Sequence, residues 1–195
     1  MEHVNKYFEE VTFIAQNIDR QKIESFANAL RTTRDISNGR VFVLGVGGSA
    51  GNASHMVNDL RKLCGIEAYA PTDNTSELTA RTNDEGFDTV FVEYLRTSRF
   101  TQGDTLVVLS VGGGSVERNV SVGLIKAIDY AHKMEGCVLS IVGKEDGYAA
   151  TKSDLAVVVP VANPNRITPH SEAFQAVVWH CVVSHPELQM RKTKW

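Results

Sequence analysis

The sequence predicts an α/β fold, a three-layer αβα sandwich with a central parallel sheet of about five strands, preceded by two N-terminal helices. Two observations carry this prediction. Apolar, β-branched runs alternate with segments of helical spacing from residue 40 onward. Strands that alternate with helices are joined by right-handed crossovers, which give a parallel sheet covered on both faces. With 195 residues, 43% of them hydrophobic, the chain can also bury a core without disulfide bonds.

Two helices are expected before the first strand, over residues 4–18 and 20–37, because apolar residues recur there at helical spacing. Strands are expected at 40–45, 66–70, 104–110, 136–142 and 154–159. Further helices are expected near 50–64, 88–99, 116–134 and 168–184. The last helix has a marked start, because Thr168 can act as its N-cap and Pro169 stands at the first helical position.

The chain is expected to form one domain over residues 1–195, with its core at 38–185 and a fraying tail at 186–195. A formal net charge of -3 offers no basic field for a nucleic-acid backbone. The N-terminus is charged where a signal peptide would be apolar, and no apolar run approaches the ~20 residues that span a bilayer. We therefore expect a cytoplasmic protein with no nucleic-acid or membrane partner.

The cysteines lack CxxC spacing and are expected as buried, reduced thiols: Cys64, Cys137 and Cys181.

Two loops share a glycine-serine composition. "GVGGSAGN" (45–52) and "SVGGGS" (110–115) each follow an expected strand, and in open α/β sheets ligands bind beyond the carboxyl ends of strands. Glycine permits close backbone approach, helix-start N–H groups carry partial positive charge, and serine adds donors for an oxyanion. One such loop is more often only a tight turn, but two at equivalent places predict a phosphate cradle. Its backbone positions are Gly47, Gly48, Gly112 and Gly113.

A dinucleotide site is the alternative reading of the first loop. Gly45, Gly47 and Ala50 fit the GxGxx(G/A) fingerprint, and Glu67 follows about 20 residues later, where a ribose-binding acid would stand. The fit is weak, because a Rossmann domain usually opens with its fingerprint strand and because the second loop has no role in it. An NAD-dependent oxidoreductase therefore remains the less favoured hypothesis.

Charged side chains share two expected helix faces. His55 and Asp59 stand four residues apart, so both point the same way from adjacent turns. Glu172 and His180 stand eight residues apart, about 800° of helix rotation, which places them on one side two turns apart. Imidazole and carboxylate on one face are typical of a metal or acid-base site, although each pair alone is more often a surface pair.

These segments resemble one known family. "GVGGSAGNASHMVNDL", "LTARTNDEGF" (78–87), the second glycine-serine loop and the last helix are similar to the SIS (sugar isomerase) family, and within it to the phosphoheptose isomerases. The resemblance implies an enzyme that interconverts sedoheptulose 7-phosphate and D-glycero-D-manno-heptose 7-phosphate. It also implies a homotetramer built partly by the N-terminal helices (1–37), active sites at subunit interfaces and, in many members, a bound zinc ion.

The resemblance gives roles to individual positions. His55 and His180 match the family's two histidines, Asp59 stands where a catalytic glutamate is usual, and Glu172 stands where a glutamine ligand is usual. The phosphate-loop serines are matched by Ser49, Ser110 and Ser115, and an active-site Asn-Asp pair by Asn83 and Asp84. The expected zinc ligands are His55, Asp59, Glu172 and His180, since two imidazoles and two carboxylates suffice for a tetrahedral site.

The expected chemistry is proton transfer beside a carbonyl. Asp59 is the expected base, His180 exchanges protons with the oxygens, and zinc polarises the carbonyl. Asp is one methylene shorter than Glu, so Glu172 remains the alternative base.

The phosphate loops depart from the family pattern. Val46 replaces an asparagine, and Val111 and Gly112 replace two hydroxyl residues. A hydrogen bond to a charged group is worth roughly 1.5–3 kcal/mol, so binding of the phosphate is expected to be altered. This keeps open a second function class, a catalytically weak SIS-type scaffold that binds a sugar phosphate or bridges partner proteins.

Overall fold

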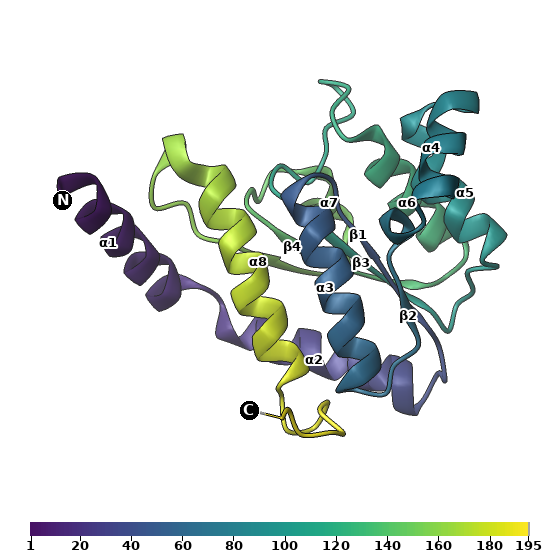
Figure 1. Cartoon of the computed structure of the whole chain (residues 1–195), viewed down its shortest axis with the longest axis horizontal. Coiled ribbons are helices and arrows are strands. Elements are labelled where there is room, and N and C mark those ends of the chain that lie inside the picture. The colour runs from purple at the N-terminus through teal and green to yellow at the C-terminus, as the bar shows by residue number, and fades with distance from the viewer. Residues whose placement is uncertain (195) are drawn as a thin grey trace.

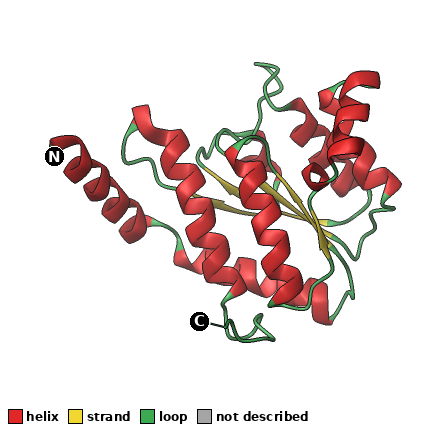
Figure 2. Ribbon diagram, viewed as in Figure 1, coloured by secondary structure: helices red, strands yellow, loops and turns green. Residues whose placement is uncertain are grey.

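The computed structural model describes residues 1–194, which form a parallel five-stranded sheet between two layers of helices (Figures 1 and 2). The strands are β1 (Val41–Leu44), β2 (Ala68–Tyr69), β3 (Thr105–Ser110), β4 (Cys137–Val142) and β5 (Leu155–Val158). Their order in the sheet is β2-β1-β3-β4-β5. Every neighbouring pair is parallel, so the predicted fold class is confirmed.

Helices cover both faces of this sheet. They are α1 (Glu2–Asn17), α2 (Arg20–Asp35), α3 (Gly48–Lys62), α4 (Thr75–Asp84), α5 (Val90–Thr97), α6 (Val122–Lys133), α7 (Tyr148–Lys152) and α8 (Ile167–Val183). Alternate strand residues enter two separate cores: Val41 and Val43 pack with α2, α3 and α8, whereas Phe42 and Leu44 pack with α5 and α6. Buried apolar runs in the sequence therefore served as central strands covered on both sides.

Three helical segments differ from the prediction: α4 and α7 were not predicted, and α6 begins later than expected. Helix α4 was missed because it buries no residue and so carries no apolar stripe, and α7 is only a five-residue turn of helix. The helix expected near 116–134 begins at Val122, because Ser115 and Val120 pair as a short antiparallel bridge and the residues between them turn.

The predicted start of the last helix lies two positions too late. Helix α8 begins at Ile167 with Arg166 as its N-cap, since a 3-10 turn (Pro164–Arg166) leads directly into it. Thr168 therefore does not cap the helix, and Pro169 is accepted because it still lies in the first turn, where backbone N–H groups have no intrahelical partner.

The prediction that all of the cysteines are buried is also wrong. All of them are free thiols, but Cys181 is exposed.

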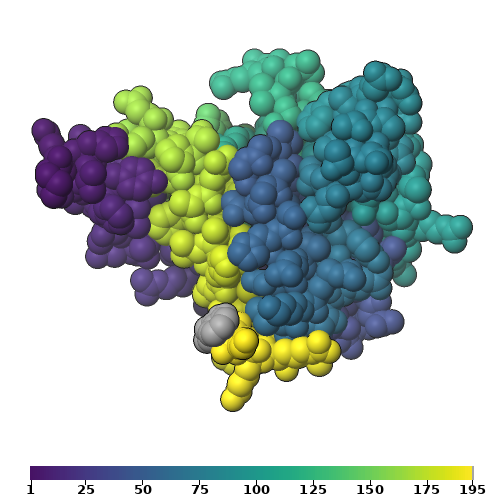
Figure 3. All heavy atoms as spheres, in the orientation of Figure 1, coloured from purple at the N-terminus to yellow at the C-terminus, as the bar shows by residue number. Residues whose placement is uncertain are grey.

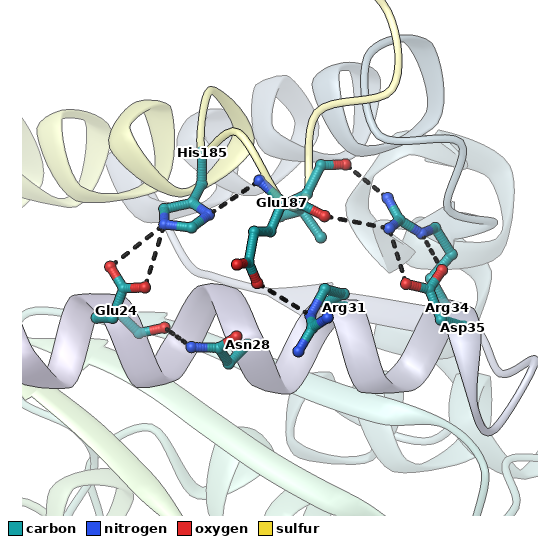
Figure 4. Close-up of polar contacts among 8 residues, drawn as sticks. Glu24, Asn28, Arg31, Arg34, Asp35, His185 and Glu187 are labelled. Atoms are coloured by element: carbon teal, nitrogen blue, oxygen red, sulfur yellow. Dashed lines mark hydrogen bonds and ion pairs between the residues drawn. The ribbon is translucent and has the colours of Figure 1, made fainter.

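The tail beyond α8 packs against the body instead of fraying (Figure 4). Leu188 is fully buried, and Arg34 of α2 donates to its carbonyl oxygen and to that of Cys64. The N–H groups of Met190 and Arg191 both donate to Leu63 O. The fraying prediction is therefore wrong up to Arg191, while Trp195 lies outside the described residues.

Helix α1 extends away from the sheet as an arm (Figure 1). Its outer residues Phe8 and Phe13 are exposed, whereas Glu10 is buried. The Glu10 carboxylate accepts hydrogen bonds from Asn163 (2.8 Å) and Arg166 (2.8 Å), and these contacts hold its pKa far below the usual range. The arm is thus fixed to the segment that precedes α8.

None of the helices in residues 1–194 has the length and apolarity to span a membrane.

Candidate functional site

The first glycine-serine turn lies at the carboxyl end of β1, where the strand order reverses between β1 and β3, the usual position of ligand sites in such sheets. Gly47 has a φ of +63° and is the N-cap of α3, and Ser49 is buried. The carboxylate of Glu172 from α8 rests against Gly48: a Cβ at that position would lie 2.5 Å from Glu172 Oε2. The positive start of α3 is therefore already faced by an anionic group of the chain itself.

The second glycine-serine turn uses its own hydroxyl groups to hold its shape. Ser110 Oγ accepts a hydrogen bond from Gly113 N at 3.0 Å, and Gly113 has a φ of +72°. Ser115 Oγ accepts from Arg118 N at 3.2 Å. Close packing against the next loop requires glycine, because a Cβ at Gly147 would lie 2.2 Å from Gly112 O. Two of the three predicted phosphate-loop serines thus stabilise the loop.

The start of α6 opens into a cavity of about 620 Å³. Ser121 is the N-cap of α6, and its side chain makes no capping hydrogen bond. The cavity is lined by Val46, Phe87, Asp88, Phe91, Asn119, Ser121, Val122, Gly123 and Leu124. A free hydroxyl and the N–H groups at the start of a 12-residue helix are suited to bind an oxyanion.

Ser121 was not among the serines that the sequence singled out, which were Ser49, Ser110 and Ser115. The available signal was a serine directly before the apolar helical pattern of "VGLIKAIDYA". One negative charge lines this cavity, Asp88, and it is paired with Lys126 of α6. The hydrogen bond from Lys126 lowers the pKa of Asp88. The carboxylate is thereby charge-neutralised and opposes a bound phosphate less than a free carboxylate would.

A cluster of possible metal ligands lies on the outer side of α3 and α8, which run side by side (Figures 1 and 3). One ligand atom from each of His55, Asp59 and His180 lies within 4.8 Å of the other two. His55 Nε2 is 3.9 Å from Asp59 Oδ2, and the His55 side chain is 56% exposed. Three of the four predicted residues on the two helix faces therefore lie close together.

The hydrogen bonding of His180 leaves one ring nitrogen available. His180 Nδ1 lies 2.8 Å from Ala176 O, and since a carbonyl oxygen only accepts, Nδ1 is the donor of this contact and Nε2 is the ring nitrogen left for another partner. This backbone contact is typical of metal-binding histidines. Two imidazoles and one carboxylate also match catalytic zinc sites, where three protein ligands leave a fourth position for water or substrate. The residues present therefore fit a zinc ion.

The remaining predicted site residues lie elsewhere in the single chain. Glu172 is separated from His180 by about 12 Å along the helix axis, at ~1.5 Å per residue, and it is not part of the ligand group. Asn83 and Asp84 are exposed at the end of α4 and bond to each other at 2.7 Å. Their roles stay predictions.

The SIS domain family matches residues 6–143 of the chain. The chain belongs to this family. A phosphoheptose isomerase from Chlorobaculum tepidum is 36% identical over 160 residues, which cover 78% of this chain and 71% of the relative. A phosphoheptose isomerase from Rhodospirillum rubrum is 32% identical over 149 residues, 74% of this chain and 73% of the relative.

The fold of this SIS domain also matches solved structures. A phosphoheptose isomerase from Neisseria gonorrhoeae has a TM-score of 0.80 at 26% identity, covering 93% of this chain and 96% of that one. Together with the sequence relatives, this places the SIS domain among the phosphoheptose isomerases.

The dinucleotide alternative does not hold for this SIS domain. Glu67 precedes β2 and its carbonyl oxygen bonds Val41 N at the amino end of β1, whereas a ribose-binding acid belongs at the carboxyl ends of the strands. Its carboxylate instead accepts a hydrogen bond from Tyr69 at 2.8 Å. The fingerprint at Gly45 is therefore a tight strand-to-helix turn, because a Cβ at Gly45 would lie 2.3 Å from Ser49 O.

Proposed function

We propose that this SIS domain protein is an aldose-ketose isomerase that interconverts sedoheptulose 7-phosphate and D-glycero-D-manno-heptose 7-phosphate in the cytoplasm. Its membership among the phosphoheptose isomerases supports the reaction class. The observation that carries the proposal is the cluster of His55, Asp59 and His180, whose ligand atoms lie within 4.8 Å of one another. A base, a proton carrier and a metal-binding group are what proton transfer beside a carbonyl requires.

The phosphate group is proposed to bind at the start of α6. Ser121 contributes its hydroxyl, and the N–H groups of Val122 and Gly123 face the same cavity. Phe87 and Phe91 give the cavity apolar walls, which suit the C–H groups of a sugar chain. This position explains how phosphate is held although the second glycine-serine turn has lost two hydroxyl residues.

The proton transfers are assigned to side chains of the helix-face cluster. Asp59, as base, removes the proton from the carbon beside the carbonyl and returns it to the neighbouring carbon. His180 exchanges protons with the substrate oxygens through Nε2, the ring nitrogen that a zinc ion would otherwise occupy, because Nδ1 is bonded to Ala176 O. Its proton-transfer and metal-binding roles are therefore alternatives. A zinc ion held by His55, Asp59 and His180 would polarise the carbonyl. Glu172 is the alternative base, since its carboxylate lies at the carboxyl edge of the sheet beside Gly48.

The assembled protein is proposed to be a homotetramer in which neighbouring copies complete each active site. The cluster lies on α3 and α8, which pack with one face of the sheet, whereas the cavity is walled by η2 (Phe87–Thr89), α5 and α6 on the other. One chain therefore holds its phosphate-binding cavity and its cluster on separate surfaces. The exposed apolar residues of α1, including Phe8 and Phe13, are proposed to form part of the subunit contacts.

A catalytically weak scaffold that binds sugar phosphates is the second candidate. It is favoured by Val46, an apolar side chain at the cavity where a polar one would bind a sugar hydroxyl. A coupled assay with sedoheptulose 7-phosphate separates the two functions, because a scaffold binds this compound without turnover.

Two isosteric variants test the assignment of the base. If Asp59 is the base, Asp59→Asn abolishes turnover while its metal content stays near that of the wild type, and Glu172→Gln retains turnover; if Glu172 is the base, Glu172→Gln abolishes turnover and Asp59→Asn with normal metal content retains it. Asp73→Asn is the matched control, because Asp73 is exposed and is not a member of the cluster. Full activity in both test variants contradicts the mechanism, and sedoheptulose 7-phosphate that binds the wild type without turnover supports the scaffold.

A further inference from the structure

A buried indole lies against both histidines of the cluster. Trp179 is 0% exposed, and its ring stacks on His180 with centroids 3.6 Å apart and planes at 28°. The same indole meets His55 edge to face, at 4.6 Å and 68°. The two imidazoles are themselves 5.2 Å apart and nearly perpendicular. One rigid side chain thus contacts both of the candidate metal-binding rings.

Both histidines are exposed to solvent, so a rigid neighbouring side chain is needed to hold each ring in one orientation. An exposed imidazole samples several rotamers, and fixing it opposes metal binding through the loss of side-chain entropy. His180 has a second restraint in the bond from Nδ1 to Ala176 O. Among the polar groups of residues 1–194, only the carboxylate of Asp59 lies near the His55 ring, at 3.9 Å, so packing on Trp179 decides the orientation of His55.

Packing of the core alone does not account for an indole at this position. Trp179 Nε1 has no hydrogen-bond partner among residues 1–194 although it is buried. A buried donor without a partner is unfavourable, and a phenylalanine or leucine would fill an apolar core without one. Leucine has no aromatic face and phenylalanine has a smaller one than the indole, which contacts both imidazoles.

We propose that Trp179 is a positioning residue that holds His55 and His180 in the orientation that binds a divalent metal ion. The proposal rests on the metal site of the proposed function. Trp179 donates no ligand atom; it acts by reducing the freedom that the two imidazoles lose when a metal binds, which is pre-organisation.

Zinc affinity of purified variants, measured by competition with a chromophoric chelator, tests this role. Trp179→Leu is expected to weaken zinc binding about tenfold, ~1.4 kcal/mol, whereas Trp179→Phe, which keeps an aromatic face, recovers most of the affinity. Val178→Ala is the control, because Val178 is buried in the neighbouring position of α8. It is expected to lower thermal stability without changing zinc affinity. A change in Val178→Ala as large as that in Trp179→Leu assigns the effect to packing and overturns the proposal.

Fluorescence gives a second readout that leaves Trp179 in place. The chain has two tryptophans, so in Trp195→Phe the emission comes from Trp179. Cobalt(II) added to this variant is expected to quench that emission with the same midpoint as its visible absorption band, and His55→Ala is expected to abolish both. Cobalt binding without quenching places the metal away from the indole and overturns the proposal.

These experiments distinguish an error in the proposed metal site from an error in the positioning role of Trp179. If wild-type protein binds neither zinc nor cobalt, the metal site is wrong and the positioning role is wrong with it. If the wild type binds metal and Trp179→Leu binds it equally well, the metal site stands and the positioning role alone is overturned.

Discussion

Two variants that are inactive alone should restore activity when they share the proposed homotetramer. Asp59→Asn removes the proposed base, and Ser121→Asp places a carboxylate at the start of α6, where the phosphate is proposed to bind. The second variant is expected to fold, because aspartate is a good N-cap and tolerates the φ of +52° at this position. It therefore removes phosphate binding without removing the helix.

The size of each effect follows from the geometry. Two unit charges ~4 Å apart at an effective dielectric constant of ~20 repel by about 4 kcal/mol, which weakens substrate binding on the order of a thousandfold. In tetramers mixed at random from both variants, a site built from two different copies has an intact base in half of the cases and an intact cavity in half. Roughly one quarter of the sites are then functional.

Co-expression of the two variants with different affinity tags provides the mixed tetramers, and the coupled isomerase assay measures the recovered activity. Each variant purified alone is the baseline. Ser121→Asn, which has the same shape without the charge, should lose much less activity than Ser121→Asp. Mixed tetramers that carry both tags and still show no activity would mean that base and cavity come from the same copy, and the argument from opposite sheet faces would be wrong.

Two further predictions concern stability, both measured by chemical denaturation. Gly45→Ala forces a Cβ to within 2.3 Å of the backbone oxygen of Ser49 and should destabilise the protein by about 1–3 kcal/mol, whereas Gly51→Ala, with open space around it, should stabilise it by roughly 0.5–1 kcal/mol; equal effects would contradict the close contact. Contacts with Arg166 lower the pKa of Glu10, so its contribution is present above the unfolded pKa of ~4.3 and lost as the pH falls. Between about pH 5 and about pH 3, wild type should therefore lose more stability than Glu10→Gln, and parallel losses would exclude this role.

The sheet was predictable because each central strand is a short, β-branched apolar run, and burial on both faces demands that composition. The surface helix α4 was not, because its stability comes from polar contacts and caps that leave no periodic apolar signal. The hairpin after Ser115 was also missed. Its polar residues precede the apolar pattern of α6 and do not differ in composition from a helix start.

Half of the candidate site could be read from local spacing. His55 and Asp59 share a helix face by their interval of four, and that geometry is present. The meeting of this face with His180 depends on how α3 packs against α8, which no local pattern specifies. The same packing places Glu172 against Gly48, two turns away from the cluster to which the family resemblance had assigned it.

The position of the segment after α8 determines where a tag can be attached. Helices α3 and α8 begin at the carboxyl edge of the sheet and run in the same direction, so the segment after α8 reaches the opposite end of the molecule (Figure 1). There Arg34 and Leu63 bind its backbone. A fluorophore, a surface anchor or a fused enzyme attached behind this segment would face away from the entrance to the cavity. The protein can thus be immobilised by its C-terminal side while substrate still enters from the bulk.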